Sequence, residues 1–214
     1  MSTRRATSPA AKPGRRPYHH GDLRRALLDA AVSFLADHEV VSLNLQVVAK
    51  AAHVSPGAPY HHFADKVELL AALATEGFAT LFEALQQASE RQREPNARLR
   101  EFVVAYLDFA AQAPSHYRVM FLSDLGDRVR FRELHEMSGR SLDLLRQLLS
   151  AQLPGESALA LSARSVAAFA TCHGFASLRA AGVLTNIPGL PSLGVLRRAA
   201  AAQVVAGLQA SSPR

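Results

Sequence analysis

Apolar residues recur at helical spacing along most of the chain. From Asp22 to Leu35 they repeat in the i, i+3, i+4, i+7 pattern of an amphipathic helix. The same spacing marks further segments at about 66–91, 95–113, 114–123, 128–153, 157–181 and 191–209. No segment shows the apolar and polar alternation of a strand, so we expect an all-α protein of about nine helices.

Helix-start signals divide the segment before residue 66 into short pieces. Asn44 is the expected N-cap of a second helix, and Ser55 followed by Pro56 suits the start of a third helix of about two turns. Pro59 removes a hydrogen bond from this helix and shortens or tightens it. Two short helices joined by a tight turn form a helix-turn-helix, the unit that places its second helix in the DNA major groove.

The long helix that follows has its own start signal. Asp65 with Glu68 three residues later is an acidic form of the capping box, and apolar residues then continue to about Arg91. We expect this helix to link the short helices to the rest of the chain. The length of 214 residues allows one domain or two small ones.

The charge distribution favours an anionic partner. The net charge is +6 and the pI about 10.1. Much of it lies in the first 20 residues, which hold five cations and no acidic residue. Beside a helix-turn-helix we interpret this segment as a flexible arm in which Arg15 and Arg16 contact DNA. A solubilising tail is the alternative.

Several classes of function are disfavoured. No HExxH, glycine-rich phosphate loop or GxSxG motif is present, so we expect no catalytic residue, metal site or cofactor. The single cysteine, Cys172, has no partner for an internal disulfide, and a redox role for it stays open. No apolar run approaches the ~20 residues of a membrane span, and we expect a cytoplasmic protein without a membrane partner.

Three adjoining segments resemble the tetracycline-repressor (TetR) family of bacterial transcription regulators. They are YHHGDLRRALLDAA at 18–31, LNLQVVAKAAHVSPGAPYHHF at 43–63 and ADKVELLAAL at 64–73. The resemblance implies a homodimer that binds double-stranded DNA at a near-palindromic operator and acts as a repressor released by a small-molecule effector. It implies a flexible basic arm at 1–20, a helix-turn-helix DNA-binding domain at 21–66, and a ligand-binding and dimerisation domain at 67–214.

The DNA contacts follow from the geometry of the helix-turn-helix together with the resemblance. Residues at the start of the recognition helix meet base edges first, and flanking polar residues hold phosphates. We expect base contacts from Ser55, Pro56, Gly57, Ala58 and His61, and phosphate contacts from Asn44, Gln46, Tyr60 and Lys66. Tyr60 and Phe63 could instead close the small core, and we assign Phe63 to that role.

Two positions depart from the family pattern. Glu39 and His53 stand where the family commonly has glycines at helix ends. A left-handed backbone at such a position costs a non-glycine residue about 1 kcal/mol. We therefore expect strain in these turns without loss of the fold.

The C-terminal half resembles the family less closely. PSHYRVMF at 114–121 and CHGFASLRAAG at 172–182 are similar to a C-terminal type that carries a Trp-His-Gly motif, with Cys172 in place of Trp. Each residue that could line an effector pocket could equally belong to the core. The candidates are Tyr106, Phe109, His116, Tyr117, Met120, Phe121, His135, Met137, Cys172, His173 and Phe175. Such a pocket suits a hydrophobic or weakly acidic molecule.

A non-specific architectural DNA-binding protein is the main alternative function. Its basic tail would bind DNA with strong salt dependence and little sequence preference. The long apolar helical half argues against this class, because a simple DNA coater does not need it.

Overall fold

The computed structural model describes residues 20–209. Its helices are α1 (His20–Asp37), η1 (Val40–Ser42), α2 (Leu45–Ala51), η2 (Ala58–His61), α3 (Lys66–Glu90), α4 (Pro95–Gln112), α5 (Pro114–Met120), η3 (Ser123–Leu125), α6 (Arg132–Gln152), α7 (Ala158–Ala180), α8 (Val183–Asn186) and α9 (Leu193–Gln209), where η marks a 3-10 helix. The described residues contain no strand, and the all-α prediction is confirmed.

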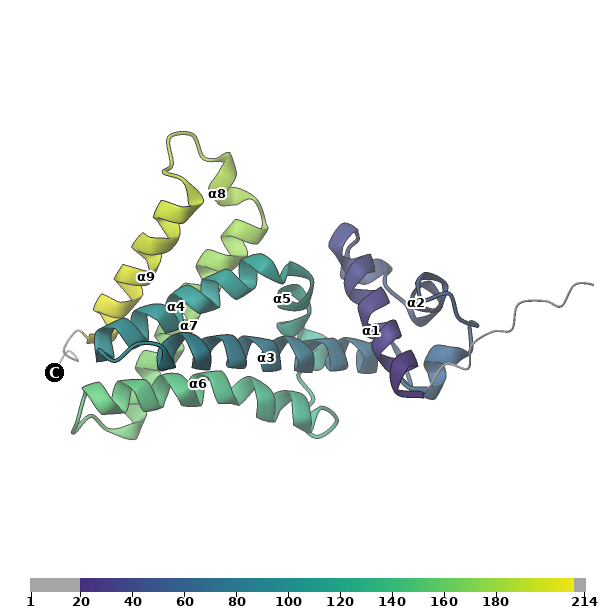
Figure 1. Ribbon diagram of the computed structural model, residues 1–214, viewed down its shortest axis with the longest axis horizontal. Helices are drawn as coiled ribbons and strands as arrows, with labels where there is room; N and C mark the ends of the chain where they lie inside the picture. The colour runs from purple at the N-terminus through teal and green to yellow at the C-terminus, as the bar shows by residue number, and fades with distance from the viewer. Residues whose placement is uncertain (1–19, 210–214) are drawn as a thin grey trace, which may run out of the picture.

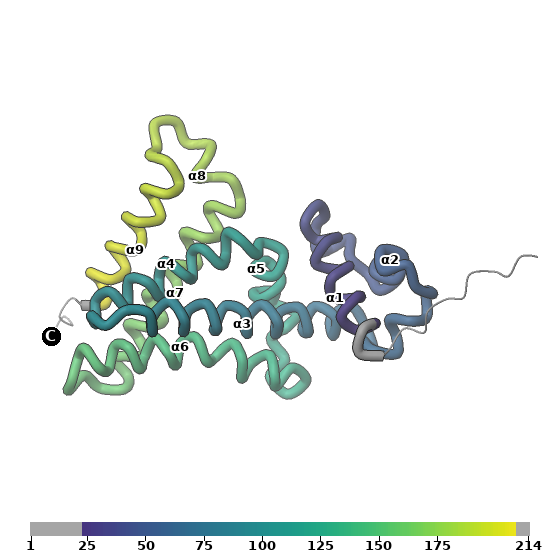
Figure 2. The backbone as a smooth tube through the Cα atoms, viewed as in Figure 1, coloured from purple at the N-terminus to yellow at the C-terminus, as the bar shows by residue number. Residues whose placement is uncertain are grey.

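The long helix α3 joins the two parts of the molecule (Figure 1). Its first turns lie beside α1, and its remainder packs between α4, α5 and α6. Helices α7 and α9 cover the far side of α4, with α8 between them in the chain (Figure 2). Buried apolar residues form one continuous cluster from Leu27 in α1 to Leu208 in α9. The N-terminal helices therefore share a core with the helical bundle through α3.

Side-chain caps fix the starts of α2 and α3. The Asn44 side-chain oxygen accepts a hydrogen bond from the Val47 amide at 2.9 Å, as predicted. The Asp65 carboxylate accepts from the Glu68 amide at 2.9 Å, and the Glu68 carboxylate reaches back to the Ala64 amide. The Asp65 cap is as predicted, and the pair differs from a standard capping box only in that Glu68 accepts from the residue before the N-cap.

The predicted α-helix at Ser55 is wrong in type and in start. The segment contains only the 3-10 helix η2, and Ser55 does not cap it with its side chain. The amide of Ala58 bonds to the Ser55 carbonyl at 3.0 Å and that of Tyr60 to the Gly57 carbonyl at 3.2 Å, both over three residues. Pro59 has no N–H that could bond to the carbonyl of Ser55, so no α-helical turn forms there. The sequence predicted that Pro59 would shorten this helix, and in the structure it is replaced by a 3-10 helix.

The sixth helix also begins later than expected. It starts at Arg132 rather than near residue 128. The Asp127 carboxylate accepts hydrogen bonds from the amides of Val129 and Arg130, each at 3.0 Å. These bonds stabilise a turn that competes with the helix, and they hold the pKa of Asp127 below its usual value.

His53 has the left-handed conformation that its place in the sequence predicts. Its φ of 56° is the only positive φ of a non-glycine residue within 20–209. The Val54 amide bonds to the Ala49 carbonyl and the His53 amide to the Lys50 carbonyl, which is a Schellman ending of α2. The strain expected at Glu39 is absent, because its φ of −75° and ψ of 151° are extended.

We expect His53→Gly to stabilise the protein. Glycine adopts a positive φ without steric cost, so the gain is about 1 kcal/mol, or roughly 2–4 °C in melting temperature for a domain of this size. Differential scanning calorimetry measures the shift. His61→Gly is the matched control and should lower the melting temperature, because His61 lies in η2 at negative φ. An unchanged or lower value for His53→Gly contradicts the strained-turn explanation.

Candidate functional site

The turn between α2 and η2, together with η2 itself, presents a nearly continuous exposed surface. Ser55, Pro56, Gly57 and His61 are exposed, as is Gln46 on α2, and Ala58 is half-buried. The Tyr60 side chain is 53% exposed, which excludes the core role for it, whereas Phe63 is 2% exposed and fills the core as predicted. No atom lies within 4 Å of the Cβ that a side chain at Gly57 would add, so the surface is open there.

Two of the predicted phosphate contacts also have a structural role. The Lys66 ammonium group donates to the Val40 carbonyl at 2.7 Å and to the Val41 carbonyl at 3.2 Å. It thereby ties the start of α3 to η1. The side-chain oxygen of Asn44 is used in the cap of α2, so any phosphate contact there comes from its NH2 group. Arg15 and Arg16 lie outside the described residues.

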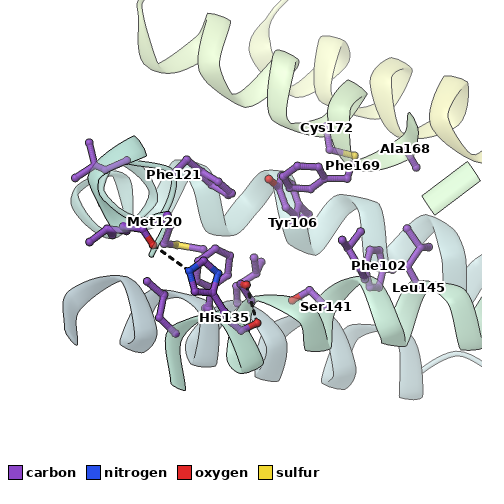
Figure 3. A pocket seen from close by; sticks show the side chains of 18 of the residues that line it. Phe102, Tyr106, Met120, Phe121, His135, Ser141, Leu145, Ala168, Phe169 and Cys172 are labelled. Atoms are coloured by element: carbon purple, nitrogen blue, oxygen red, sulfur yellow. Dashed lines mark hydrogen bonds between the residues drawn. The ribbon is translucent and has the colours of Figure 1, made fainter. Parts of the chain in front are cut away.

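A cavity of about 360 Å³ lies inside the C-terminal bundle (Figure 3). Helices α3, α4, α6 and α7 surround it, and the segment from the end of α5 through η3 covers one end. Its lining is mostly aliphatic and aromatic: Phe78, Leu81, Phe102, Val103, Tyr106, Met120, Phe121, Leu122, Ser123, Leu125, Gly126, Leu134, His135, Ser138, Ser141, Leu142, Leu145, Ala168, Phe169 and Cys172. No Asp, Glu, Lys or Arg is among these residues.

Some of the predicted pocket residues line this cavity and others do not. Tyr106, Met120, Phe121, His135 and Cys172 line it. Phe109, His116, Tyr117, Met137, His173 and Phe175 do not. Tyr117 and His173 are linked to the cavity residue Tyr106 by a chain of hydrogen bonds. The Tyr106 and Tyr117 hydroxyls are 3.0 Å apart, and the Tyr117 hydroxyl is 2.8 Å from Nδ1 of His173.

The other predicted pocket residues that do not line the cavity lie in different parts of the structure. Nε2 of His116 lies 3.8 Å from the Glu76 carboxylate, outside the cavity. Phe109 is buried in the hydrophobic core, and the partly buried Met137 packs against that core. Phe175 lines a second, smaller cavity of about 100 Å³ beside α4 and α5. The sequence pattern marked these residues as buried or aromatic without showing which face of each helix would meet the cavity.

On the α6 side of the cavity only His135 was predicted from the sequence, whereas Ser138 and Ser141 were not. His135, Ser138 and Ser141 follow each other at spacings of three residues and line one wall together. Ser138 and Ser141 lie on the same face of α6 as Leu134 and Leu145, so they interrupt the apolar face of this amphipathic helix. That interruption is the signal in the sequence that could have identified them.

Burial shifts the pKa of three groups in or beside the cavity. Nε2 of His135 lies 3.0 Å from the Leu125 carbonyl, which makes this nitrogen a donor. Burial raises the pKa of Tyr106 above its usual value and that of the Cys172 thiol to about 12. Burial also lowers the pKa of His173, which favours the neutral form of its ring. Tyr106 and Cys172 are therefore uncharged at neutral pH.

The segment from α5 to the start of α6 also contacts the N-terminal helices. The Arg118 guanidinium donates to the Leu35 carbonyl near the end of α1. Arg130 donates to the Asp65 carboxylate, the cap of α3, at 2.5 Å. Met120 and Leu125 of the same segment line the cavity. Residues 114–131, which we call the connecting segment, therefore touch both the cavity and the N-terminal helices.

Helices α7 and α9 carry exposed apolar side chains that no other part of the described chain covers. Leu159, Val166 and Leu178 on α7 are 82%, 55% and 47% exposed, and Val195 on α9 is 42% exposed. Most exposed positions between them are small, namely Ala163, Ala167, Ala170, Gly174, Ala199, Ala202 and Ala206, and Arg198 is the charged residue exposed among those on α9. Charged residues normally occupy a solvated helix face, so this surface, which we call the α7–α9 face, is suited to close helix packing.

The described residues contain neither a membrane-spanning helix nor a cluster of metal-binding side chains. None of the helices within 20–209 has the length and hydropathy of a membrane span. The same residues hold no group of three or more His, Cys, Asp or Glu side chains arranged to bind a metal ion.

We expect the Cys172 thiol to react slowly with a maleimide at neutral pH. With a pKa of about 12 and 5% exposure, it is almost entirely in the unreactive thiol form and out of reach. The reaction should reach the rate of a peptide cysteine only in denaturant. Mass spectrometry of the labelled protein measures both rates. Rapid labelling of the folded protein would instead support a redox or electrophile-sensing role.

Two family models match this chain. The model for bacterial regulatory proteins of the tetR family matches residues 27–73, and the model for a tetracyclin repressor-like C-terminal domain matches residues 99–202. The first covers α2 and η2, and the second covers most of the cavity wall.

Solved structures resemble the whole described fold. A protein of unknown function from Rhodococcus sp. RHA1 is 33% identical, with 90% of this chain and 98% of that chain covered and a TM-score of 0.71. A transcriptional regulator from Rhodococcus sp. RHA1 is 25% identical, with 87% and 96% covered and a TM-score of 0.65. FadR from Bacillus subtilis in complex with stearoyl-CoA is 18% identical, with 86% and 98% covered and a TM-score of 0.68, and shows the shared fold.

Proposed function

The chain belongs to the TetR family of DNA-binding transcription regulators, and we propose that it is a cytoplasmic homodimeric repressor that a small molecule in the 360 Å³ cavity releases from DNA. The observation that carries the proposal is the connecting segment, which lines the cavity and holds the N-terminal helices. The protein acts by binding alone, without a catalytic step.

In this proposal the turn and η2 read the operator. Ser55, Pro56, Gly57, Ala58 and His61 face base edges, and the small residues among them allow close approach to the groove. Tyr60 donates its exposed hydroxyl to a phosphate, together with Asn44, Gln46 and the remaining N–H of Lys66. Arg15 and Arg16 add contacts from the arm.

Release follows from a change in the connecting segment. A ligand that displaces Met120 or Leu125 alters the position of α5 and of Arg130, and with them the hydrogen bonds to Leu35 and Asp65. The two recognition elements of the dimer then no longer fit successive major grooves. The shift is limited by the difference in ligand affinity between the two conformations.

The α7–α9 face is the proposed dimer interface. Its small residues permit two helices of each chain to approach closely, and its exposed leucines and valines supply buried apolar area. A short recognition element reads few base pairs, so a two-fold dimer is needed for a specific operator. Helices α7 and α9, which carry these exposed residues, pack against each other within the chain.

Selection from random duplex DNA tests the function. Purified protein is incubated with the pool at moderate salt, and the retained DNA is sequenced. We expect a near-palindromic motif to be enriched. The Tyr60→Ala variant should retain the same motif with weaker affinity, because a phosphate contact carries no sequence information. Retention without enrichment would favour the architectural alternative, and no retention would refute DNA binding.

We expect Val166→Glu to convert the dimer to a monomer. The carboxylate would be buried without a partner in the proposed interface, at a cost of about 3 kcal/mol or more. Light scattering coupled to size-exclusion chromatography measures the mass, and operator affinity should fall with it. Ser150→Glu on the exposed side of α6 is the matched control and should stay dimeric. A dimeric Val166→Glu protein would place the interface elsewhere.

A further inference from the structure

The Ser141 hydroxyl is a polar group without a partner in an apolar cavity. Its oxygen is buried and makes no hydrogen bond within the protein. Figure 3 shows it on α6, facing the space that Tyr106 borders from α4 and Phe169 and Cys172 border from α7. A buried hydroxyl loses free energy unless a water or ligand satisfies it.

Ser141 differs from other hydroxyls inside helices of this protein. Those of Thr75, Ser89, Ser138, Ser150, Ser165 and Thr171 each donate to a carbonyl three or four residues earlier. This is the usual way in which a helix satisfies such a group. Ser138, which lines the same wall, is among them. The Ser141 hydroxyl is therefore left for whatever occupies the cavity.

The rest of the lining disfavours a charged ligand. No Asp, Glu, Lys or Arg lines the cavity, and the Nε2 of His135 is engaged by the Leu125 carbonyl. An ionised group that entered would lose its hydration without gaining an opposite charge. Aromatic rings from α3, α4 and α7 and the segment after α5 contribute much of the wall, including Phe78, Phe102, Phe121 and Phe169. Such a wall favours planar apolar groups.

We propose that the effector is an uncharged, predominantly apolar molecule with a carbonyl or hydroxyl oxygen that hydrogen-bonds to Ser141. The cavity of about 360 Å³ lies at the small end of the range for drug-sized ligands. This inference rests on the proposed function only where it calls the ligand an effector; the binding of a neutral ligand in the cavity does not depend on it. It narrows the sequence expectation of a hydrophobic or weakly acidic molecule by excluding the acid.

Three naphthalenes of similar shape test the proposal. 2-Acetylnaphthalene carries a neutral carbonyl, 2-naphthoate carries a carboxylate, and 2-isopropylnaphthalene has no polar group. Equilibrium dialysis against the full-length protein, without DNA, gives the dissociation constant of each. The chain has no Trp, so the long-wavelength naphthyl absorption is read without protein interference.

We expect the ketone to bind about five-fold more tightly than the hydrocarbon, the gain of one neutral hydrogen bond. The carboxylate should bind at least about ten-fold more weakly than the ketone. Ser141→Ala should remove the advantage of the ketone, leave hydrocarbon binding within about two-fold, and keep or raise the melting temperature. Ser150→Ala on the outer side of α6 is the matched control, because its hydroxyl donates to the Gln147 carbonyl.

The proposal is overturned if the carboxylate binds as well as the ketone, if Ser141→Ala leaves the ratio of ketone to hydrocarbon affinity unchanged, or if none of the three binds. These outcomes are independent of DNA binding. A ketone that binds through Ser141 but leaves operator affinity unchanged would refute release by this molecule while upholding the assignment of the cavity.

Discussion

The close approach of α5 to α3 at Gly77 is the constraint on which the rest of the arrangement depends. A Cβ at this position would lie 2.7 Å from the Met120 sulfur and 3.2 Å from Cβ of His116. With glycine there, α5 lies directly on α3, Met120 reaches the cavity, and Arg118 reaches the end of α1. A larger residue would force the Met120 side chain out of its position at the cavity and would press on Cβ of His116 in α5.

Coupling between the two parts of the molecule follows from this packing. Glu76, the neighbour of Gly77, pairs with Arg25 of α1 and lies 3.8 Å from Nε2 of His116 on α5. Farther along, Arg130 holds the cap of α3 through Asp65. These polar links surround a continuous apolar core, so α1 cannot move relative to α3 without disturbing α5. Close-packed interiors transmit such displacements because they have few voids to absorb them.

The sequence predicted the elements better than it predicted the cavity. Periodicity and capping residues located the helices, and the left-handed His53 followed from a missing glycine. The late start of α6 was missed, because the Asp127 turn depends on side-chain bonds that compete with helix formation. Lining residues such as Phe102 and Phe169 could not be told from core residues. Which face of a buried helix borders a void depends on how several helices pack, and Gly77 decides part of that packing.

The cavity itself is evidence about how the protein balances stability against response. An apolar void in a core lowers stability, because its lining loses packing contacts that a larger side chain would supply. Here the void also holds the unsatisfied hydroxyl of Ser141 and is closed at one end by the connecting segment. A ligand that fills it stabilises whichever conformation binds it, in proportion to its concentration relative to its dissociation constant. Since the connecting segment also contacts α1 and α3, the stabilised conformation fixes the position of the DNA-reading helices as well.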